Sequence, residues 1–326
     1  MKGDAQPLIK FFDGSDKRFI IPLYQRNYDW KEENCEQLFQ DLMKLHNSNR
    51  RSHFFGSIVS SIQSGTEDRF IIDGQQRITT VSLLLIAMVN AKKEGLIEAT
   101  DAKLVEKIFK RYLVDEYQED ERKVKLKPIK KDMQAFDALL YKQKDQYIKE
   151  SNVTRNYDFF YNKITSIGLT LDELFETIKK LEVINIRLDE DDDPQLIFES
   201  LNSTGLDLSE ADKIRNYLLM SLTPEKQHMC FKNYWQKIEQ ATENQPTKFL
   251  RDYLTIKQQL QRPVRQSNIY YEWKKYMDGH DRKEELVKML DYAHYYQQVT
   301  EAKLSTAKLS EKMRHICNIE TDVTNV

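Results

Sequence analysis

The polar segment at residues 73–77, DGQQR, lies between two apolar runs and carries residue types that can hold an anion. The run before it predicts a strand, and the run after it, as far as about Lys93, predicts a helix that is apolar nearly all round. Free backbone N–H groups at a helix start, together with the guanidinium of Arg77, could form a cradle for phosphate. A cation in the first helical turn faces the positive end of the helix dipole, which a bound anion would offset.

The same segment also fits a purely structural role. Asp73 and Gln76 have the spacing of a capping box, and Gly74 suits the tight turn between strand and helix. Such a cap contributes about 1 kcal/mol to helix stability. It does not account for Arg77. The spacing alone therefore favours a plain helix cap and a ligand site equally.

A second polar cluster, IPLYQRNYDW at residues 21–30, follows another strand candidate. Arg26 could supply a second phosphate contact, and Tyr24 or Tyr28 could stack on a base. The alternative is an aromatic lid over the edge of the core, with Trp30 packed beneath it.

A third cluster, IFESLNSTGLDLSEADKIRNYLL, predicts a corner between two helices, the second with a Ser209/Asp212 capping box. If that corner faces the ligand, Asn202, Asp212 and Arg215 are its polar candidates. A corner with no part in binding is the alternative interpretation.

Composition predicts a helix-rich globular protein, because 326 residues include only 9 Gly and 7 Pro. With a formal net charge of -2, the chain lacks the overall basicity of many nucleic-acid-binding proteins. Local clusters of basic residues must therefore hold any anionic partner. The few cysteines are far apart, which fits a reducing cytoplasm. The longest apolar run, residues 81–89, is too short to span a membrane. We therefore expect a cytoplasmic protein.

The periodicities predict an α+β fold. Strand candidates are RFIIP, FFGSIVSSI, RFIID and LEVINIRL, and the helix after residue 27 has an Asp29/Glu32 capping-box spacing. We expect a small mixed-sheet domain at residues 1–95 and a larger, mainly helical region at 96–326. The strand candidate at 182–188 could rejoin the N-terminal sheet.

Five segments, taken in order, resemble a known family. They are IPLYQRNYDW, FFGSIV, IIDGQQRITTVSLLL, NYDFF and IFESLNSTGLDLSEADKIRNYLL. They resemble the signature segments of the DGQQR-motif domain with a ParB/sulfiredoxin-like fold. That domain forms the N-terminal half of GmrSD-type modification-dependent restriction systems and of related phage-defence proteins.

The resemblance implies nucleoside triphosphate binding and hydrolysis, with Mg²⁺, coupled to nuclease action on modified or foreign DNA. Carried over, Arg77 would hold phosphate oxygens, and Asp73 would cap the helix or help to hold the divalent cation. Gln75 or Gln76 would position water or phosphate. With the clusters above, the candidates are Asp73, Gln75, Gln76 and Arg77 for catalysis, and Tyr24, Gln25, Arg26, Gly74, Arg77, Asn202, Asp212 and Arg215 for nucleotide binding.

Two-part members of this family carry a C-terminal nuclease domain of the His-Asn-His type. None of the six histidines of this chain lies in a segment of that type, so autonomous nuclease activity is not expected. The nuclease would be a further domain or a separate subunit. Basic stretches at residues 122–131 and 248–265 could track a DNA backbone, or could be solvated faces balanced by neighbouring acids.

The sequence thus predicts a nucleotide-binding and nucleotide-hydrolysing sensor module of a bacterial restriction or anti-phage defence system. The alternative is a non-hydrolysing module that binds a nucleotide or DNA phosphate and recruits a separate nuclease. The oligomeric state stays open.

Overall fold

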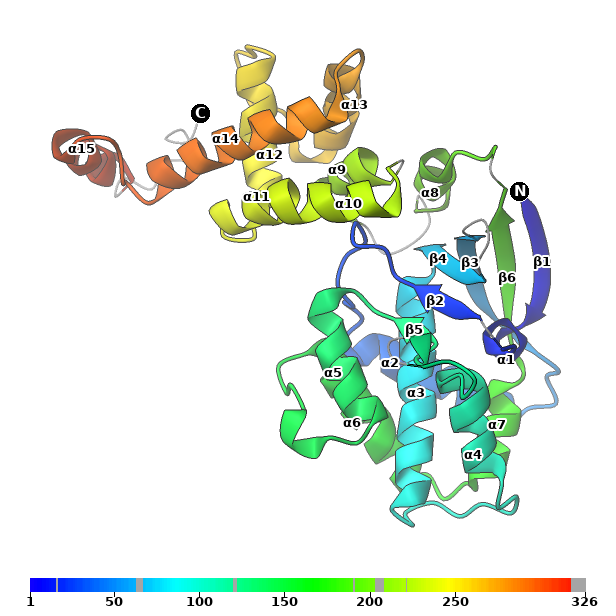
Figure 1. Cartoon of the computed structure of the whole chain (residues 1–326). Helices are drawn as coiled ribbons and strands as arrows, with labels where there is room; N and C mark the ends of the chain where they lie inside the picture. Colours follow the sequence, from blue (N-terminus) through cyan, green and yellow to red (C-terminus); the bar gives the residue numbers. More distant parts are fainter. Residues whose placement is uncertain are drawn as a thin grey trace. The chain divides into compact units, whose positions relative to one another are not determined.

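The computed structural model divides by contacts into two units, residues 1–194 and 195–326, which we call the first and second unit. It describes residues 1–15, 17–62, 67–119, 122–189, 191–202, 208–220 and 222–317. The first unit combines a six-stranded sheet with helices, whereas the described part of the second unit is helical (Figure 1). The α+β class predicted from sequence is confirmed, and the ParB/sulfiredoxin-like type of fold stays a prediction.

The sheet is mixed, with the strand order β1-β6-β3-β4-β2-β5. Its strands are β1 (Lys2–Pro7), β2 (Arg18–Ile20), β3 (His53–Ile62), β4 (Asp68–Asp73), β5 (Leu126–Lys127) and β6 (Leu181–Leu188). β6 pairs antiparallel with β1 and parallel with β3, while β3 and β4 are antiparallel. All four strand candidates form, and β6 joins the N-terminal sheet in its interior.

One helix of the first unit, α3 (Gln75–Lys93), is buried along almost its whole length. The others are α1 (Leu8–Phe12), α2 (Glu32–His46), α4 (Leu104–Ile108), the π-helix η1 (Phe109–Leu113), α5 (Lys130–Leu140), the short 3₁₀ helix η3 (Lys144–Gln146), α6 (Asn152–Ser166) and α7 (Leu171–Ile178). α3 packs against α4, η1, α5 and α6. Of these, Figure 1 labels α4, α5 and α6 beside α3. Its central position, predicted from its all-round apolar surface, is confirmed.

The start of α2 corrects one prediction. The capping box expected from Asp29 and Glu32 is wrong, because the helix begins at Glu32 and Lys31 is its N-cap. The side chain of Asn34 accepts a hydrogen bond from the backbone N–H of Lys31, and the carboxylate of Asp29 pairs with the ammonium of Lys31 instead. The apolar side chains of this helix are buried on one face: Cys35, Leu38, Phe39, Leu42 and Leu45.

The second unit consists, where described, of helices packed on large aromatic side chains. They are α8 (Pro194–Asn202, which begins at the boundary), α9 (Glu210–Leu219), α10 (Pro224–Cys230), η4 (Phe231–Trp235), α11 (Gln236–Ala241), α12 (Pro246–Lys257), η5 (Gln266–Asn268), α13 (Ile269–Met277), α14 (Arg282–Thr300) and α15 (Ala307–Cys317). Trp235, Tyr253 and Trp273 are almost fully buried in it. Ser209 caps α9 by accepting a hydrogen bond from the N–H of Asp212, as predicted.

The helices between residue 95 and β6 belong by their contacts to the first unit, with the sheet. The domain boundary expected after residue 95 stays a prediction, because the grouping of contacts does not say which segment folds alone. No helix in the described part of the chain has the length and apolarity needed to cross a membrane.

Candidate functional site

The DGQQR segment joins β4 to α3 through a glycine. Asp73 is the last residue of β4, Gly74 is the N-cap of α3 with φ +92°, and no side chain caps the helix. The capping box predicted from Asp73 and Gln76 is therefore wrong. A Cβ at Gly74 would lie 3.0 Å from the carbonyl oxygen of Ser57, so this turn needs glycine both for its conformation and for its space.

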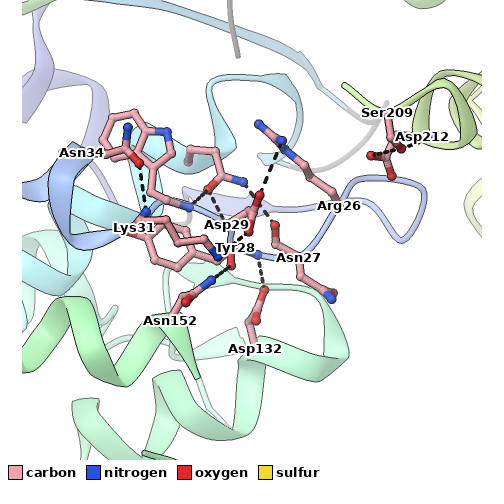
Figure 2. A network of polar contacts seen from close by, with 12 residues as sticks. Arg26, Asn27, Tyr28, Asp29, Lys31, Asn34, Asp132, Asn152, Ser209 and Asp212 are labelled. Carbon is pink, nitrogen blue, oxygen red and sulfur yellow. Dashed lines mark hydrogen bonds and ion pairs between the residues drawn. The ribbon is translucent and has the colours of Figure 1, made fainter. Parts of the chain in front are cut away.

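The side chain of Gln76 holds the neighbouring loop rather than the helix start. Its Oε1 accepts hydrogen bonds from the backbone N–H groups of Asp29 and Trp30, at 2.9 and 3.1 Å. Its Nε2 donates to the carbonyl oxygen of Asn27 at 3.2 Å. Figure 2 shows Asn27 and Asp29 of this loop among neighbouring polar side chains. Gln76 thus fixes the backbone that follows Arg26.

Arg77 is seated on strand β3. Gly56 has φ +118°, and a Cβ built there would lie 2.6 Å from Nε of Arg77, so the guanidinium rests directly on the glycine backbone. The guanidinium also donates a hydrogen bond to the carbonyl oxygen of Ser57 at 3.4 Å. The FFGSIV segment is therefore the support of Arg77, which explains why a glycine stands within a strand.

Two guanidinium groups act on one carboxyl group here. Burial raises the pKa of Asp73, and the nearby charges of Arg77 and Arg26 oppose that rise. Arg26 also lies 3.8 Å from the carboxylate of Asp29, which is half exposed (Figure 2). The positive charges gather at the start of a 19-residue helix without a side-chain cap. This arrangement can attract an anion.

The other predicted residues of the loop are buried. Tyr24 is 3% exposed, and Nε2 of Gln25 donates a 2.8 Å hydrogen bond to the carbonyl oxygen of Ile72. The hydroxyl of Tyr28 shares a 2.7 Å hydrogen bond with Thr80 of α3. These positions fit the alternative interpretation of an aromatic lid better than they fit rings open to a base.

Sequence reasoning missed three polar residues that position this loop, among them Asn152 of α6, whose Nδ2 donates to the carbonyl oxygen of Tyr28 at 3.4 Å (Figure 2). Asn156, in the NYDFF segment of α6, is buried and donates hydrogen bonds to the Tyr28 hydroxyl and the Trp30 carbonyl oxygen, at 2.9 and 2.8 Å. Asp132 of α5 accepts a 2.7 Å hydrogen bond from the backbone N–H of Tyr28. Burial raises the pKa of Asp132. The only sequence signal was that Asn156 lies within one of the five quoted segments.

The candidates of the third cluster belong to the second unit. Arg215 is 7% exposed and pairs with the carboxylates of Asp212 at 2.6 Å and Glu239 at 3.1 Å. Asn202 is the last residue of α8, and its side chain lies outside the described part of the structure. The role of these residues in nucleotide binding stays a prediction.

No group of three or more His, Cys, Asp or Glu side chains able to hold a metal ion occurs among the described residues. Asp73, the predicted metal ligand, has two arginines as its charged neighbours. A cation at Asp73 would thus depend on phosphate oxygens for further ligands, and it stays a prediction.

Of the basic side chains of residues 122–131 and 248–265, only some are exposed to solvent. In the first, Lys125 is 3% exposed and donates to the carbonyl oxygens of Phe12, Gly14 and Arg111. In the second, the ammonium of Lys257 lies over the ring of Tyr292, at 4.6 Å from its centre. Arg122, Lys123, Lys130 and Lys131 in the first stretch and Arg262 and Arg265 in the second are exposed. DNA binding by either stretch stays a prediction.

Four of the five segments that resemble the family lie together in the first unit. Arg26, Gly56, Arg77 and Asn156, from four of the five segments, are joined by the contacts described above within the first unit. No curated protein matches the chain. A family model described as the GmrSD restriction endonuclease, N-terminal domain, matches residues 8–219, about two thirds of the chain. The chain therefore belongs to the GmrSD restriction endonuclease N-terminal domain family, whose members are components of restriction systems.

Proposed function

We propose that the first unit binds a nucleoside triphosphate with Mg²⁺ at residues 73–77 and hydrolyses it. It would act as the sensor module of a restriction or anti-phage system directed at modified or foreign DNA. One observation carries the proposal: the charges of Arg26 and Arg77 both act on Asp73, next to the N-terminus of α3, which no side chain caps. A structural cap would require neither cation, although Arg26 also pairs with Asp29 and Arg77 also contacts Ser57.

The chemistry of phosphoryl transfer suits this arrangement. Backbone N–H groups at a helix start and guanidinium groups bind phosphate oxygens, and the guanidinium can do so through two parallel hydrogen bonds. Hydrolysis needs charge neutralisation around the transferred phosphoryl group and an aligned water molecule. We assign the neutralisation to Arg77, Arg26 and Mg²⁺. Gln75 is the remaining glutamine for water alignment, because the amide of Gln76 is engaged by the loop.

A second candidate function is a clamp that binds a nucleotide or a DNA phosphate without hydrolysis and recruits a nuclease. The engagement of Gln76 favours it, since one of the two predicted water-positioning amides has a structural role. Release of phosphate that depends on Mg²⁺ and on Gln75 separates the two functions. A purified chain that binds nucleotide but releases no phosphate is the clamp.

In either case the nuclease would be a separate domain or subunit. The exposed lysines and arginines of residues 122–131 and 248–265 are the proposed contacts with DNA. Such contacts predict affinity that falls steeply with salt concentration.

The first test is thermal unfolding of the purified chain with Mg²⁺ and each of the four ribonucleoside triphosphates. A ligand at about 100 times its dissociation constant stabilises the folded state by about 2.7 kcal/mol. We expect one nucleotide to raise the melting temperature and Arg77→Ala to abolish that rise. Arg51→Ala, which removes an exposed arginine outside the segment, is the matched control and should keep the rise. If no nucleotide shifts the wild-type chain, or if Arg77→Ala shifts as the wild type does, the proposal is wrong.

A further inference from the structure

The first unit has a pocket of about 540 Å³ whose lining does not include the proposed nucleotide segment. It lies between the loop after α1, the helices α4 and η1, and the loop that follows η1. Its lining residues are Asp13, Gly14, Ser15, Lys103, Glu106, Lys107, Lys110, Arg111, Asp115, Glu116, Tyr117 and Lys125. The volume falls within the range of small-molecule sites, and none of residues 73–77 contributes to it.

The acidic side chains of this pocket are largely neutralised by its own cations. Asp13 accepts two hydrogen bonds from the guanidinium of Arg111, which lowers the pKa of the carboxyl group. The ammonium of Lys110 lies 2.9 Å from Glu106 and 2.8 Å from Glu116. A ligand would therefore meet paired carboxylates rather than free ones along this wall.

A buried cation lies among the lining residues. Lys125 donates three hydrogen bonds, all to backbone carbonyl oxygens, at 2.6 to 3.3 Å. Carbonyl oxygens carry only partial negative charge, so these three hydrogen bonds alone do not neutralise the ammonium. Burial lowers the pKa of Lys125, and the nearby carboxylates of Asp115 and Asp13 oppose that change.

Two more cations at the rim have no ion pair with other described residues: Lys103 and Lys107. They are four residues apart, Lys103 as the N-cap of α4 and Lys107 in its last turn, a spacing that places side chains on the same helix face. Both are exposed. The rim also carries Tyr117, whose side chain is 80% exposed. Its backbone N–H donates to the carboxylate of Asp115, which fixes the loop beneath the ring.

We propose that this pocket binds one nucleotide unit, either free or within a single strand, with its phosphate on Lys103 and Lys107 and its base on the ring of Tyr117. Ammonium groups bind phosphate as point charges, and an exposed aromatic ring beside such a cluster is the usual stacking platform for unpaired bases. Free phosphate would need only the lysines. The exposed ring makes a nucleotide the better fit.

The test measures binding of a 5′-labelled oligothymidylate strand to the full chain carrying Arg77→Ala, so that the proposed triphosphate site does not contribute. We expect saturable binding, competition by deoxynucleoside 5′-monophosphates, and at least a tenfold loss of affinity in Lys103→Gln/Lys107→Gln. Tyr117→Ala should lose about tenfold, as the removal of one stacking ring does, and Tyr117→Phe should keep the affinity.

The matched control is Lys10→Gln/Lys149→Gln, which removes the same charge from exposed lysines that do not line the pocket. An equal loss in the control would mean unspecific attraction and would overturn the proposal. The proposal would also be overturned if inorganic phosphate competed as well as the monophosphates and Tyr117→Ala had no effect. Absence of any binding would overturn it as well. If the strand binds and monophosphates do not compete, the pocket takes a nucleotide only within a strand. If monophosphates do compete, the pocket takes free nucleotides as well. Neither result depends on the triphosphate site.

Discussion

At the scale of single residues, the site depends on a close contact between a glycine and an arginine. Arg77 occupies the space where any other residue at position 56 would place its Cβ. The guanidinium is thereby held in one place by packing as well as by its charge. Preorganised cations bind developing negative charge better than mobile ones, because they need no reorganisation.

This contact predicts the effect of Gly56→Ala. The added Cβ would push the guanidinium away and would also strain a backbone with φ +118°. We expect a loss of about 1 to 3 kcal/mol in the free energy of unfolding, the usual range for backbone strain, together with loss of nucleotide binding. Urea unfolding and the nucleotide-dependent thermal shift measure the two effects.

Gly95→Ala is the control for that prediction. Gly95 has φ +75°, and a Cβ there would meet nothing within 4 Å. This variant therefore carries backbone strain alone, and it should lose stability while keeping the nucleotide-dependent shift. Retention of the full shift in Gly56→Ala would show that the seat of Arg77 does not matter for binding.

Residue types and spacing located the polar segments that lie together in the first unit, but not what each side chain contacts. The Asp73/Gln76 spacing satisfies the rule for a capping box, yet Gly74 takes the N-cap and Gln76 reaches a loop 46 to 49 residues earlier. Asn156 reaches the same loop from 126 and 128 residues later. Such partners depend on the tertiary fold, and no local pattern in a single sequence specifies them.

At the scale of secondary-structure elements, the elements with the strongest hydrophobic patterns in the sequence were predicted best. α3 runs from Gln75 to Lys93 as expected, because its long apolar run permits no exposed face. β1 (Lys2–Pro7) carries polar residues and lies at a sheet edge, and β5 has two residues, so neither has an alternating pattern to recognise. Their pairing with neighbours, rather than their own sequence, makes them strands.

The C-terminal end of α3 gives a prediction at this scale. Glu94, its C-cap residue, pairs with Lys142 and Lys144 and accepts a hydrogen bond from Tyr161, which together lower its pKa to about 2. A carboxyl group whose pKa is lower in the folded state stabilises that state above its unfolded pKa of 4.5. This contribution is lost as the pH falls from about 4.5 to about 2.

Glu94→Gln should therefore lower the free energy of unfolding at pH 7 by about 1 kcal/mol, a small value because solvent screens these ion pairs. It should also flatten the acid limb of the stability curve in that pH window. Urea unfolding at several pH values between 7 and 2.5 measures both. An unchanged acid limb in the variant would mean that Glu94 does not tie α3 to the segments around it.

At the scale of the whole molecule, the first unit depends on both ends of its own sequence. β1 pairs only with β6 among the described strands, and β6 lies between β1 and β3. The helices after residue 95 cover α3, whose buried residues would otherwise face water.

We accordingly expect a fragment of residues 1–194 to unfold cooperatively and a fragment of residues 1–95 to remain unfolded or to aggregate. The shorter fragment lacks β6 and the helices that cover α3, so it cannot bury its apolar surface. Circular dichroism and urea unfolding of the two fragments check this. A cooperative transition in residues 1–95 would instead support the boundary expected from sequence.

The interior place of β6 also decides when the sheet can close during synthesis. About 120 residues separate the end of β3 at Ile62 from the start of β6 at Leu181. Parallel pairing over such a sequence distance raises the contact order and slows folding. A nascent chain would emerge from the ribosome with β3 able to pair with β4 but lacking its other neighbour, β6, until the helices between β4 and β6 had been made. The segment at residues 73–77, the proposed nucleotide site, would thus be translated early and acquire its final surroundings late.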